Sequence, residues 1–285
     1  MTLLLAIALL VPVPPHAVVV KPVANMYSAP SEDADVVSQA IFGSSVVLIE
    51  DQGGWVKVRT PDDYTGWMRL DTLRVENGDH TYASSSKAVQ VASLSANVYR
   101  EPSIIKHAPL LNLPFEARLE VAPKQGNSGS PSSSEWLQLR LPDERLAWIQ
   151  KGDVESDPAP LNIEGDIELA KRFIGITYLW GGTSSFGFDC SGFTQMLVRR
   201  RGMVMPRDAD VQAAWKGVEP VKRSQLHAGD LLFFGKSPQN ITHTGMYIGH
   251  GRFIHDTTHE HPGVQISRLA DEHWTKLLVA CRRLK

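Results

Sequence analysis

The sequence predicts an α+β protein in which two small antiparallel β-barrels precede a larger domain of helices and strands. Its 285 residues are enough for two domains of ordinary size, or for three if two of them are small β-modules. A stretch of short alternating segments occurs twice, which indicates a duplicated β-module. After Asp153 the apolar residues change to helical spacing, so a domain of another kind begins there.

Composition and charge limit the classes of function. Hydrophobic residues make up 42% of the chain and charged residues 21%, which is typical of a folded globular protein. Lys and Arg number 29 against 31 Asp and Glu, giving a formal net charge of −2. Because the chain has no excess of basic residues to attract phosphates, nucleic acid is not expected as a partner.

The chain begins with an apolar segment. Residues 1–13 are almost entirely apolar, but this run is shorter than the roughly 20 residues that span a bilayer, so no transmembrane segment is expected. Residues 1–18 are interpreted as an apolar leader or a possible signal peptide, although the first basic residue is Lys21. A signal peptide would place the protein outside the cytoplasm, in the periplasm or cell envelope, and a cytoplasmic location is the alternative.

The duplicated module is visible as two pairs of similar segments. Residues 25–31 and 97–103 both contain the pattern Asn-x-Tyr followed by Pro-Ser. Residues 55–59 and 136–140 both begin with Trp and alternate apolar with polar side chains. Alternation between turn residues is typical of short strands in small barrels.

These repeats define two expected domains. We place the first barrel at residues 19–77 and the second at residues 88–154. The second copy is longer, and its insertion at residues 124–134 is rich in Gly, Ser and Pro, which indicates a surface loop.

A third domain is expected over residues 160–285, after a linker marked by Pro158 and Pro160. Apolar residues at helical spacing, each run followed by a glycine, predict two helices, and apolar runs bounded by turn residues predict three strands. The expected helices are 163–174 and 191–201, and the expected strands are 230–234, 244–248 and 252–255.

The two cysteines have different surroundings. Cys190 directly precedes an amphipathic helix, where free N–H groups and the positive end of the helix dipole lower the pKa of a thiol. Cys190 is therefore the candidate nucleophile. Cys281 lies in an apolar run and is interpreted as a buried packing residue.

His243 and His255 lie on neighbouring predicted strands and are the candidates for the base that a thiol nucleophile needs. A two-residue turn at residues 250–251 would pair His255 with Met246 and place the two imidazoles on opposite faces. A bulge or a three-residue loop would place them on one face, about 7 to 8 Å apart as diagonal neighbours.

A zinc hydrolase is an alternative because the C-terminal region is rich in imidazoles, which are good zinc ligands. No His-Glu-x-x-His motif accompanies them, and no metal is expected. The imidazoles concerned are His243, His250, His255, His259 and His261.

Four sequence blocks together resemble the NlpC/P60 family of cysteine peptidases. The blocks are Tyr178-Leu179-Trp180-Gly181-Gly182, Phe188-Asp189-Cys190-Ser191-Gly192, Ala228-Gly229-Asp230-Leu231 and His243-Thr244-Gly245-Met246-Tyr247-Ile248-Gly249 followed by His255. The two repeated modules resemble bacterial SH3 (SH3b) domains. The Gly66-Trp67 pair supports this, whereas the second module has Ala147-Trp148.

The resemblance implies a papain-like α+β domain that cuts bacterial cell-wall (murein) peptides without a cofactor. Cys190 would be the nucleophile, His243 the base and His255 the third polar residue of the site. The hydroxyl of Tyr178 and the backbone N–H of Cys190 would stabilise the oxyanion.

With two preceding SH3b-like modules and the Pro206-Arg207-Asp208-Ala209 segment, the chain is similar to the γ-D-glutamyl-L-diamino acid endopeptidases. The resemblance implies that Asp208 recognises the free N-terminal ammonium of an L-Ala-γ-D-Glu peptide, because a buried ammonium needs a carboxylate partner. Further substrate contacts are expected from Asp189, Ser191, Tyr64, Trp180 and Glu32.

Other functions stay open on the sequence alone. The chain could act as a general peptidoglycan hydrolase on glycan-attached stems, or as a non-catalytic wall-binding protein. The same thiol chemistry also permits acyl transfer to an amine in place of water. The preference between meso-diaminopimelate and lysine leaves no signal in the sequence.

Overall fold

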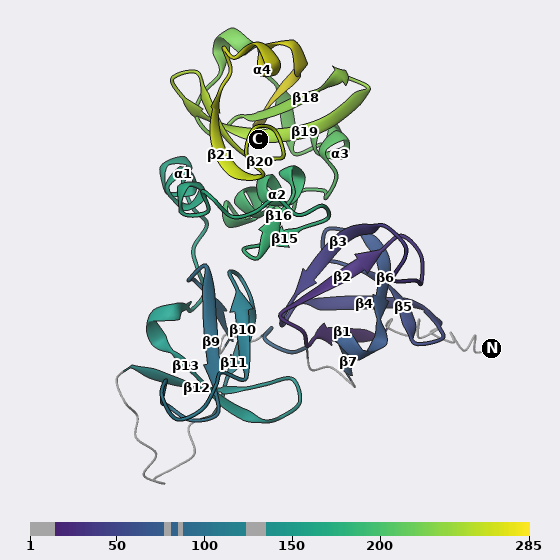
Figure 1. Ribbon diagram of the computed structural model, residues 1–285, viewed down its shortest axis with the longest axis vertical. Helices are drawn as coiled ribbons and strands as arrows, with labels where there is room; N and C mark the ends of the chain where they lie inside the picture. The colour runs from purple at the N-terminus through teal and green to yellow at the C-terminus, as the bar shows by residue number, and fades with distance from the viewer. Residues whose placement is uncertain (1–14, 77–80, 85–87, 124–134) are drawn as a thin grey trace, which may run out of the picture.

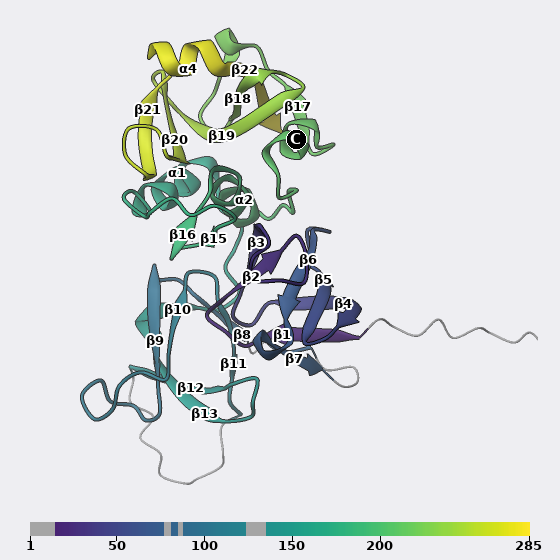
Figure 2. The same cartoon turned by 45° about the vertical axis from the view of Figure 1, so that its right-hand side comes forward.

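The computed structural model describes residues 15–76, 81–84, 88–123 and 135–285. Figures 1 and 2 show three units, with the third, C-terminal unit lying across the ends of two smaller β-units. The expected insertion at residues 124–134 and most of the expected leader lie outside the described residues. Within the described ranges, no helix is long and apolar enough to cross a membrane.

The first unit is a seven-stranded sheet with the order β3-β2-β6-β5-β4-β1-β7. Side chains such as Met26, Val58 and Met68 alternate inward along its strands and are completely buried. Residues 16–18, expected in the leader, instead pair with β4 and β7 as part of β1. The strands are β1 (His16–Val19), β2 (Val23–Tyr27), β3 (Val36–Ile41), β4 (Ser45–Gln52), β5 (Trp55–Arg59), β6 (Thr65–Arg69) and β7 (Leu73–Glu76).

The second unit repeats the first strand for strand, with the order β10-β9-β13-β12-β11-β8-β14. An edge-to-face aromatic pair recurs at equivalent places, with ring centroids 5.3 Å apart for Tyr27 and Trp55 and 5.5 Å apart for Tyr99 and Trp136. The sequence repeat therefore corresponds to a structural repeat. The strands are β8 (Ala88–Val91), β9 (Ser95–Tyr99), β10 (Leu111–Pro114), β11 (Arg118–Val121), β12 (Trp136–Arg140), β13 (Leu146–Gln150) and β14 (Val154–Glu155).

The expected closure into barrels is not seen in the strand pairing. Among the pairings of the described residues, none joins β3 to β7 or β10 to β14, the outer strands of the two sheets. The two units are therefore described as sheets of one shared topology, and the chain as a whole is mostly β with few helices.

The third unit contains a six-stranded antiparallel sheet with the order β17-β22-β18-β19-β20-β21 and a two-stranded hairpin. Both predicted helices and all three predicted strands are present with slightly shifted ends, whereas the remaining elements, β15, β16, β17, β21, β22, α3 and α4, were not predicted. The helices are α1 (Ile163–Arg172), α2 (Cys190–Arg200), α3 (Ala209–Ala214) and α4 (Glu272–Leu277). The strands are β15 (Thr183–Ser184), β16 (Gly187–Phe188), β17 (Val218–Pro220), β18 (Leu231–Ser237), β19 (Asn240–Gly249), β20 (Arg252–Thr257), β21 (Gly263–Arg268) and β22 (Leu278–Leu284).

Helix α2 is the central element of the third unit. Its residues from Cys190 to Val198 are all buried, because β19 and β20 cover one side and the β15–β16 hairpin another. The helix begins where the Asp189 side chain accepts a hydrogen bond from Gly192 N at 2.7 Å, which is an N-cap. After the helix ends at Arg200, Gly202 takes a left-handed conformation with φ +82°.

The β15–β16 hairpin, which leads into α2, contacts both smaller units. Thr183 donates its hydroxyl to Gln39 O of the first unit at 3.1 Å. The Ser185 hydroxyl accepts a hydrogen bond from Phe115 N of the second unit at 2.9 Å and donates to Leu94 O. The residues immediately before Cys190 are thus held by all three units.

Helix α2 itself also contacts both smaller units. Gln195 donates to Asp62 Oδ2 of the first unit at 2.8 Å, and Arg199 donates to the Glu116 carboxylate of the second unit. Phe115 enters the core of the third unit and packs edge-to-face on Phe173. These contacts fix the orientation of α2 relative to the first sheet.

The close approach of α2 to the preceding loop gives a testable prediction. A Cβ at Gly192 would lie 2.1 Å from the carbonyl oxygen of Gly182, and backbone atoms cannot move away cheaply. Gly192→Ala should therefore lower the free energy of unfolding by roughly 1–3 kcal/mol or more. The measurement is a urea unfolding curve.

Gly165→Ala is the matched control, because Gly165 also is the third residue of a helix and donates to an N-cap side chain, Asn162 Oδ1, at 2.8 Å. Its nearest neighbour to a new Cβ is that same side-chain oxygen, at 3.2 Å. We expect a change within about 1 kcal/mol there. Equal unfolding curves for the two variants would contradict the packing argument.

Candidate active site

The candidate nucleophile, Cys190, is the first residue of α2 and is 7% exposed. The backbone N–H groups of Thr244 and Ser191 are directed at its sulfur and favour the thiolate. Burial outweighs them and raises the pKa of the Cys190 thiol to about 12. The sequence expectation of a lowered thiol pKa at the helix start is therefore wrong for the free protein, because desolvation is the larger effect.

The two histidines lie on one face of the β19–β20 hairpin. Met246 pairs with Ile254 and Gly249 with Arg252, and a register shift between these pairs marks a bulge on β19. This shift places His255 diagonal to His243, so the alternative of a plain two-residue turn is excluded. His243 Nε2 and His255 Nδ1 are 2.7 Å apart.

A third group continues this chain of hydrogen bonds. Nε2 of His255 lies 2.9 Å from the hydroxyl of Ser267 on β21. If Nδ1 of His243 is to accept a proton from a thiol, His243 must donate from Nε2 to His255, and His255 must donate from Nε2 to Ser267. The sequence did not identify Ser267, because the alternation of residues 264–267 can predict a strand but not that this hydroxyl lies beside His255.

Aromatic side chains surround the two imidazoles. The ring of Trp274 on α4 stacks on His243 with centroids 5.2 Å apart and meets His255 edge-on at 4.7 Å. Burial lowers the pKa of His243 to about 3 and lowers that of His255 well below its ordinary value. Both imidazoles are consequently neutral near pH 7.

Asp189 and Ser191 lie beside Cys190 as expected, but their polar atoms are occupied by the protein. Arg207, 2% exposed, donates to Asp189 Oδ1 at 3.0 Å and to Oδ2 at 2.6 Å. It also donates to the Ser191 hydroxyl at 2.7 Å, and Gly181 N donates to Asp189 Oδ2 at 3.0 Å. Any contact of these two side chains with a substrate would compete with this network.

Asp208 and Tyr64 meet at the interface between the first and third units. The Tyr64 hydroxyl and the Asp208 carboxylate interact, and the negative charge of Asp208 contributes to a raised pKa of the hydroxyl. Burial raises the pKa of both groups, and the nearby Arg207 guanidinium opposes that shift. Although Asp208 is the N-cap residue of α3, its side chain makes no capping bond, which leaves the carboxylate for other partners.

The remaining candidates for substrate contacts, Tyr178, Trp180 and Glu32, differ in how near they lie to Cys190. Tyr178 is half-buried near Cys190 and Asp189, and burial raises the pKa of its hydroxyl, so it remains a donor. Trp180 is 70% exposed beside this loop. Glu32 is on the surface in an ion pair with Arg69 at 2.8 Å, and among the bonds of the described residues no hydrogen bond or ion pair joins it to Tyr64 or Asp208.

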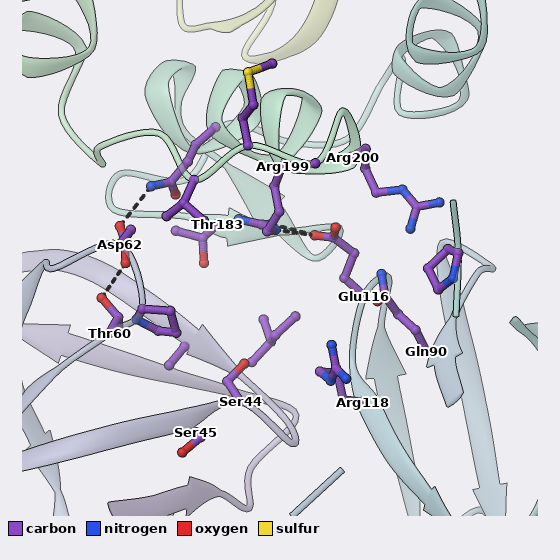
Figure 3. Close-up of a pocket in the computed structure, with 18 of the residues that line it drawn as sticks. Ser44, Ser45, Thr60, Asp62, Gln90, Glu116, Arg118, Thr183, Arg199 and Arg200 are labelled. Carbon is purple, nitrogen blue, oxygen red and sulfur yellow. Dashed lines mark hydrogen bonds and ion pairs between the residues drawn. The ribbon is translucent and has the colours of Figure 1, made fainter. Parts of the chain in front are cut away.

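The junction of the three units contains a cavity of about 700 Å³ (Figure 3). Its charged lining includes Asp62, Glu116, Arg118 and Arg199, and the Arg199 and Glu116 side chains point toward each other across it. Cys190 is not among the lining residues, nor are the two histidines. This cavity is separate from the candidate active site.

The zinc alternative requires several metal-ligating side chains to lie close together. In the part of the chain that the structure describes, no three His, Cys, Asp or Glu side chains are grouped so that they could hold a metal ion. His259 stacks on His273 with centroids 3.7 Å apart and does not join His243 and His255 as a ligand set.

The second cysteine, Cys281, is buried in β22, and burial raises its thiol pKa.

Comparison with known proteins defines the class of this protein. The NlpC/P60 family model matches residues 175–283, and the model described as the bacterial dipeptidyl-peptidase Sh3 domain matches residues 26–73. The chain belongs to the NlpC/P60 family and is a cysteine peptidase of that family.

Individual relatives make the likeness more specific. The chain is 32% identical to the gamma-D-glutamyl-L-lysine dipeptidyl-peptidase of Bacillus cereus, over 76% of this chain and 66% of that protein. It is 30% identical to the protein of the same name from Bacillus subtilis, over 88% of this chain and 82% of that one. The crystal structure of an NlpC/P60 family protein from Bacillus cereus superposes with a TM-score of 0.78 at 26% identity, covering 94% of this chain and 99% of that chain.

The neutral state of Cys190 and His243 leads to a prediction about pH. With the thiol pKa near 12 and the imidazole pKa near 3, the thiolate should form only as the pH rises far above 7. The difference in absorbance at the thiolate band between the wild type and Cys190→Ser should therefore be absent at pH 7 and appear at strongly alkaline pH. A Cys190-dependent thiolate band at pH 7 that disappears on acidification would instead indicate a preformed ion pair.

Proposed function

We propose that this protein hydrolyses the γ-D-glutamyl to L-diamino acid bond of murein peptides that carry a free N-terminal L-Ala. The observation that carries the proposal is the thiol at the start of α2 beside a β-strand that presents a hydrogen-bonded imidazole pair. The relatives named as gamma-D-glutamyl-L-lysine dipeptidyl-peptidases support the choice of bond.

The interface with the first unit supports the requirement for a free amine. Asp208 and Tyr64 come from different units and meet close to Arg207 and Asp189. A carboxylate in such a partly buried position favours a cation, and a peptide ammonium can replace water as its partner. The first SH3-like unit would thereby limit the length of peptide that fits on the N-terminal side of the cut bond.

The reaction would proceed by acyl transfer through a thioester. The Cys190 sulfur attacks the γ-carbonyl carbon while His243 Nδ1 takes the thiol proton, so the S–C bond forms as the neutral pair becomes charged. The imidazolium then gives this proton to the amine of the diamino acid as the C–N bond breaks. Water, activated by the same imidazole, hydrolyses the thioester and restores the thiol.

The tetrahedral intermediate needs donors for its oxyanion. We assign this role to the backbone N–H of Cys190, which has no acceptor within the helix, and to the Tyr178 hydroxyl. Because burial raises its pKa, that hydroxyl keeps its proton over the working pH range. Loss of one such donor typically costs about 3–4 kcal/mol of transition-state stabilisation.

We further infer that each seven-stranded sheet forms an SH3-like barrel, with domains at residues 19–77, 88–154 and 160–285. The identical strand orders and the separate apolar cores of the two sheets support this division. Strand β1 favours extending the first domain back to His16.

The choice of thiol gives the first test. Cys190→Ser should lower kcat/KM on L-Ala-γ-D-Glu-L-Lys by roughly a thousandfold or more, because a hydroxyl is a far weaker nucleophile under the same base. Cys281→Ser should leave kcat/KM near the wild-type value and alter only packing. The hydrolysis products are measured by liquid chromatography, and an active Cys190→Ser enzyme would refute the cysteine mechanism.

The role of Asp208 gives the second test. Acetylation of the N-terminal amine removes the charge that Asp208 is proposed to pair with, so kcat/KM should fall on the order of a hundredfold or more. Asp208→Asn should reduce the difference between the free and the acetylated peptide, because an amide does not require a cation. Equal cleavage of both peptides by the wild type would favour a general wall hydrolase that acts on glycan-attached stems.

A further inference from the structure

Arg207 is the most completely engaged charged side chain near Cys190. It is 2% exposed, and its guanidinium donates hydrogen bonds to both carboxylate oxygens of Asp189 in a bidentate arrangement. It donates in addition to the Ser191 hydroxyl at 2.7 Å and, from Nε, to the Ser38 hydroxyl of the first unit at 3.1 Å. Arg207 thus contacts the residues on both sides of Cys190.

A comparison with a second buried arginine–aspartate pair shows what is particular to Arg207. Arg283 makes an equivalent fork with the buried Asp230, at 2.8 Å from Nε to Oδ1 and 2.7 Å from NH2 to Oδ2. Asp230 begins no helix and lies beside the packing thiol Cys281. Asp189, in contrast, caps the helix whose first residue is Cys190.

We infer that Arg207 is a positioning residue for the nucleophile: it fixes the Asp189 cap at the start of α2 and neutralises the carboxylate closest in sequence to the Cys190 thiol. The inference rests on the proposed function, in which Cys190 attacks the substrate. The printed polar contacts of Arg207 are to Asp189, Ser191 and Ser38, so Arg207 would act on Cys190 through its neighbours.

The charges around Cys190 determine the direction of the expected effect. Asp189 opposes formation of the thiolate, whereas Arg207 favours it. Tyr178 from the preceding loop stays neutral, and His243 on β19 and His255 on β20 are neutral at pH 7. Loss of the guanidinium would therefore leave the Asp189 charge uncompensated next to the thiol and suppress its ionisation further.

The test measures alkylation of Cys190 by iodoacetamide, quantified by mass spectrometry of the Cys190 peptide between pH 7 and pH 10. In Arg207→Met the rate should fall about tenfold at each pH, equivalent to an increase of about one unit in the thiol pKa. Adding Asp189→Asn removes the uncompensated charge while asparagine still caps the helix, so the double variant should recover most of the rate. A wild-type rate in Arg207→Met, or a double variant as slow as the single one, would overturn the inference.

Arg283→Met is the matched control, because it breaks the same kind of fork far from α2. It should lower stability and leave the alkylation profile of Cys190 unchanged. If Arg207→Met does not fold, Arg207→Gln replaces it, since glutamine removes the positive charge but keeps an amide donor. Alkylation slower than wild type supports the inference there, and the wild-type rate overturns it.

The outcome can be separated from that of the proposed function. Absence of L-Ala-γ-D-Glu-L-Lys hydrolysis by the wild type would refute the proposed function whatever the alkylation rates are. Hydrolysis that is lost in Cys190→Ser, together with unchanged alkylation in Arg207→Met, would refute only the role of Arg207.

Discussion

The carboxylate of Asp189 is the group on which the site depends. It accepts hydrogen bonds from Gly181 N in the preceding loop, from Gly192 N in the helix and from both terminal nitrogens of Arg207. One buried side chain therefore connects the loop of Tyr178, the start of α2 and the segment before α3. Removing one partner of such a buried pair typically costs about 3–5 kcal/mol, because the other charge is left without compensation.

The neighbouring residues Arg207 and Asp208 also join the first small unit to the site. Arg207 donates a hydrogen bond to Ser38 on β3, and Asp208 interacts with Tyr64 in the turn before β6. Arg207 and Asp208 thus contact the same neighbouring unit, Arg207 as a buried residue and Asp208 as a partly exposed one. A displacement of the first unit would disturb the helix cap and the carboxylate together, so the position of that unit is coupled to the geometry of the site.

Local patterns explain what could be predicted from the sequence. The repeated segments, the start of α2 at Cys190 and the strands of His243 and His255 all follow from spacing, turn residues and capping, which operate within a few residues. The partners of Arg207, the bulge in β19 and the hydroxyl of Ser267 depend on contacts between distant segments, which leave no local signal. The direction of the Cys190 pKa shift was missed for the same reason, because burial of the helix start is a property of the assembled core.

Burial of the pair has a consequence for how charge appears during the reaction. With Trp274 stacked on His243 and most of the thiol covered, neither an imidazolium nor a thiolate is stabilised alone. Each charge becomes favourable only when its counterpart forms beside it, that is, when proton transfer accompanies attack on a bound carbonyl. The arrangement therefore keeps the thiol mostly protonated in the empty site, and the ordered groups around Asp189 maintain the geometry in which both charges can arise together.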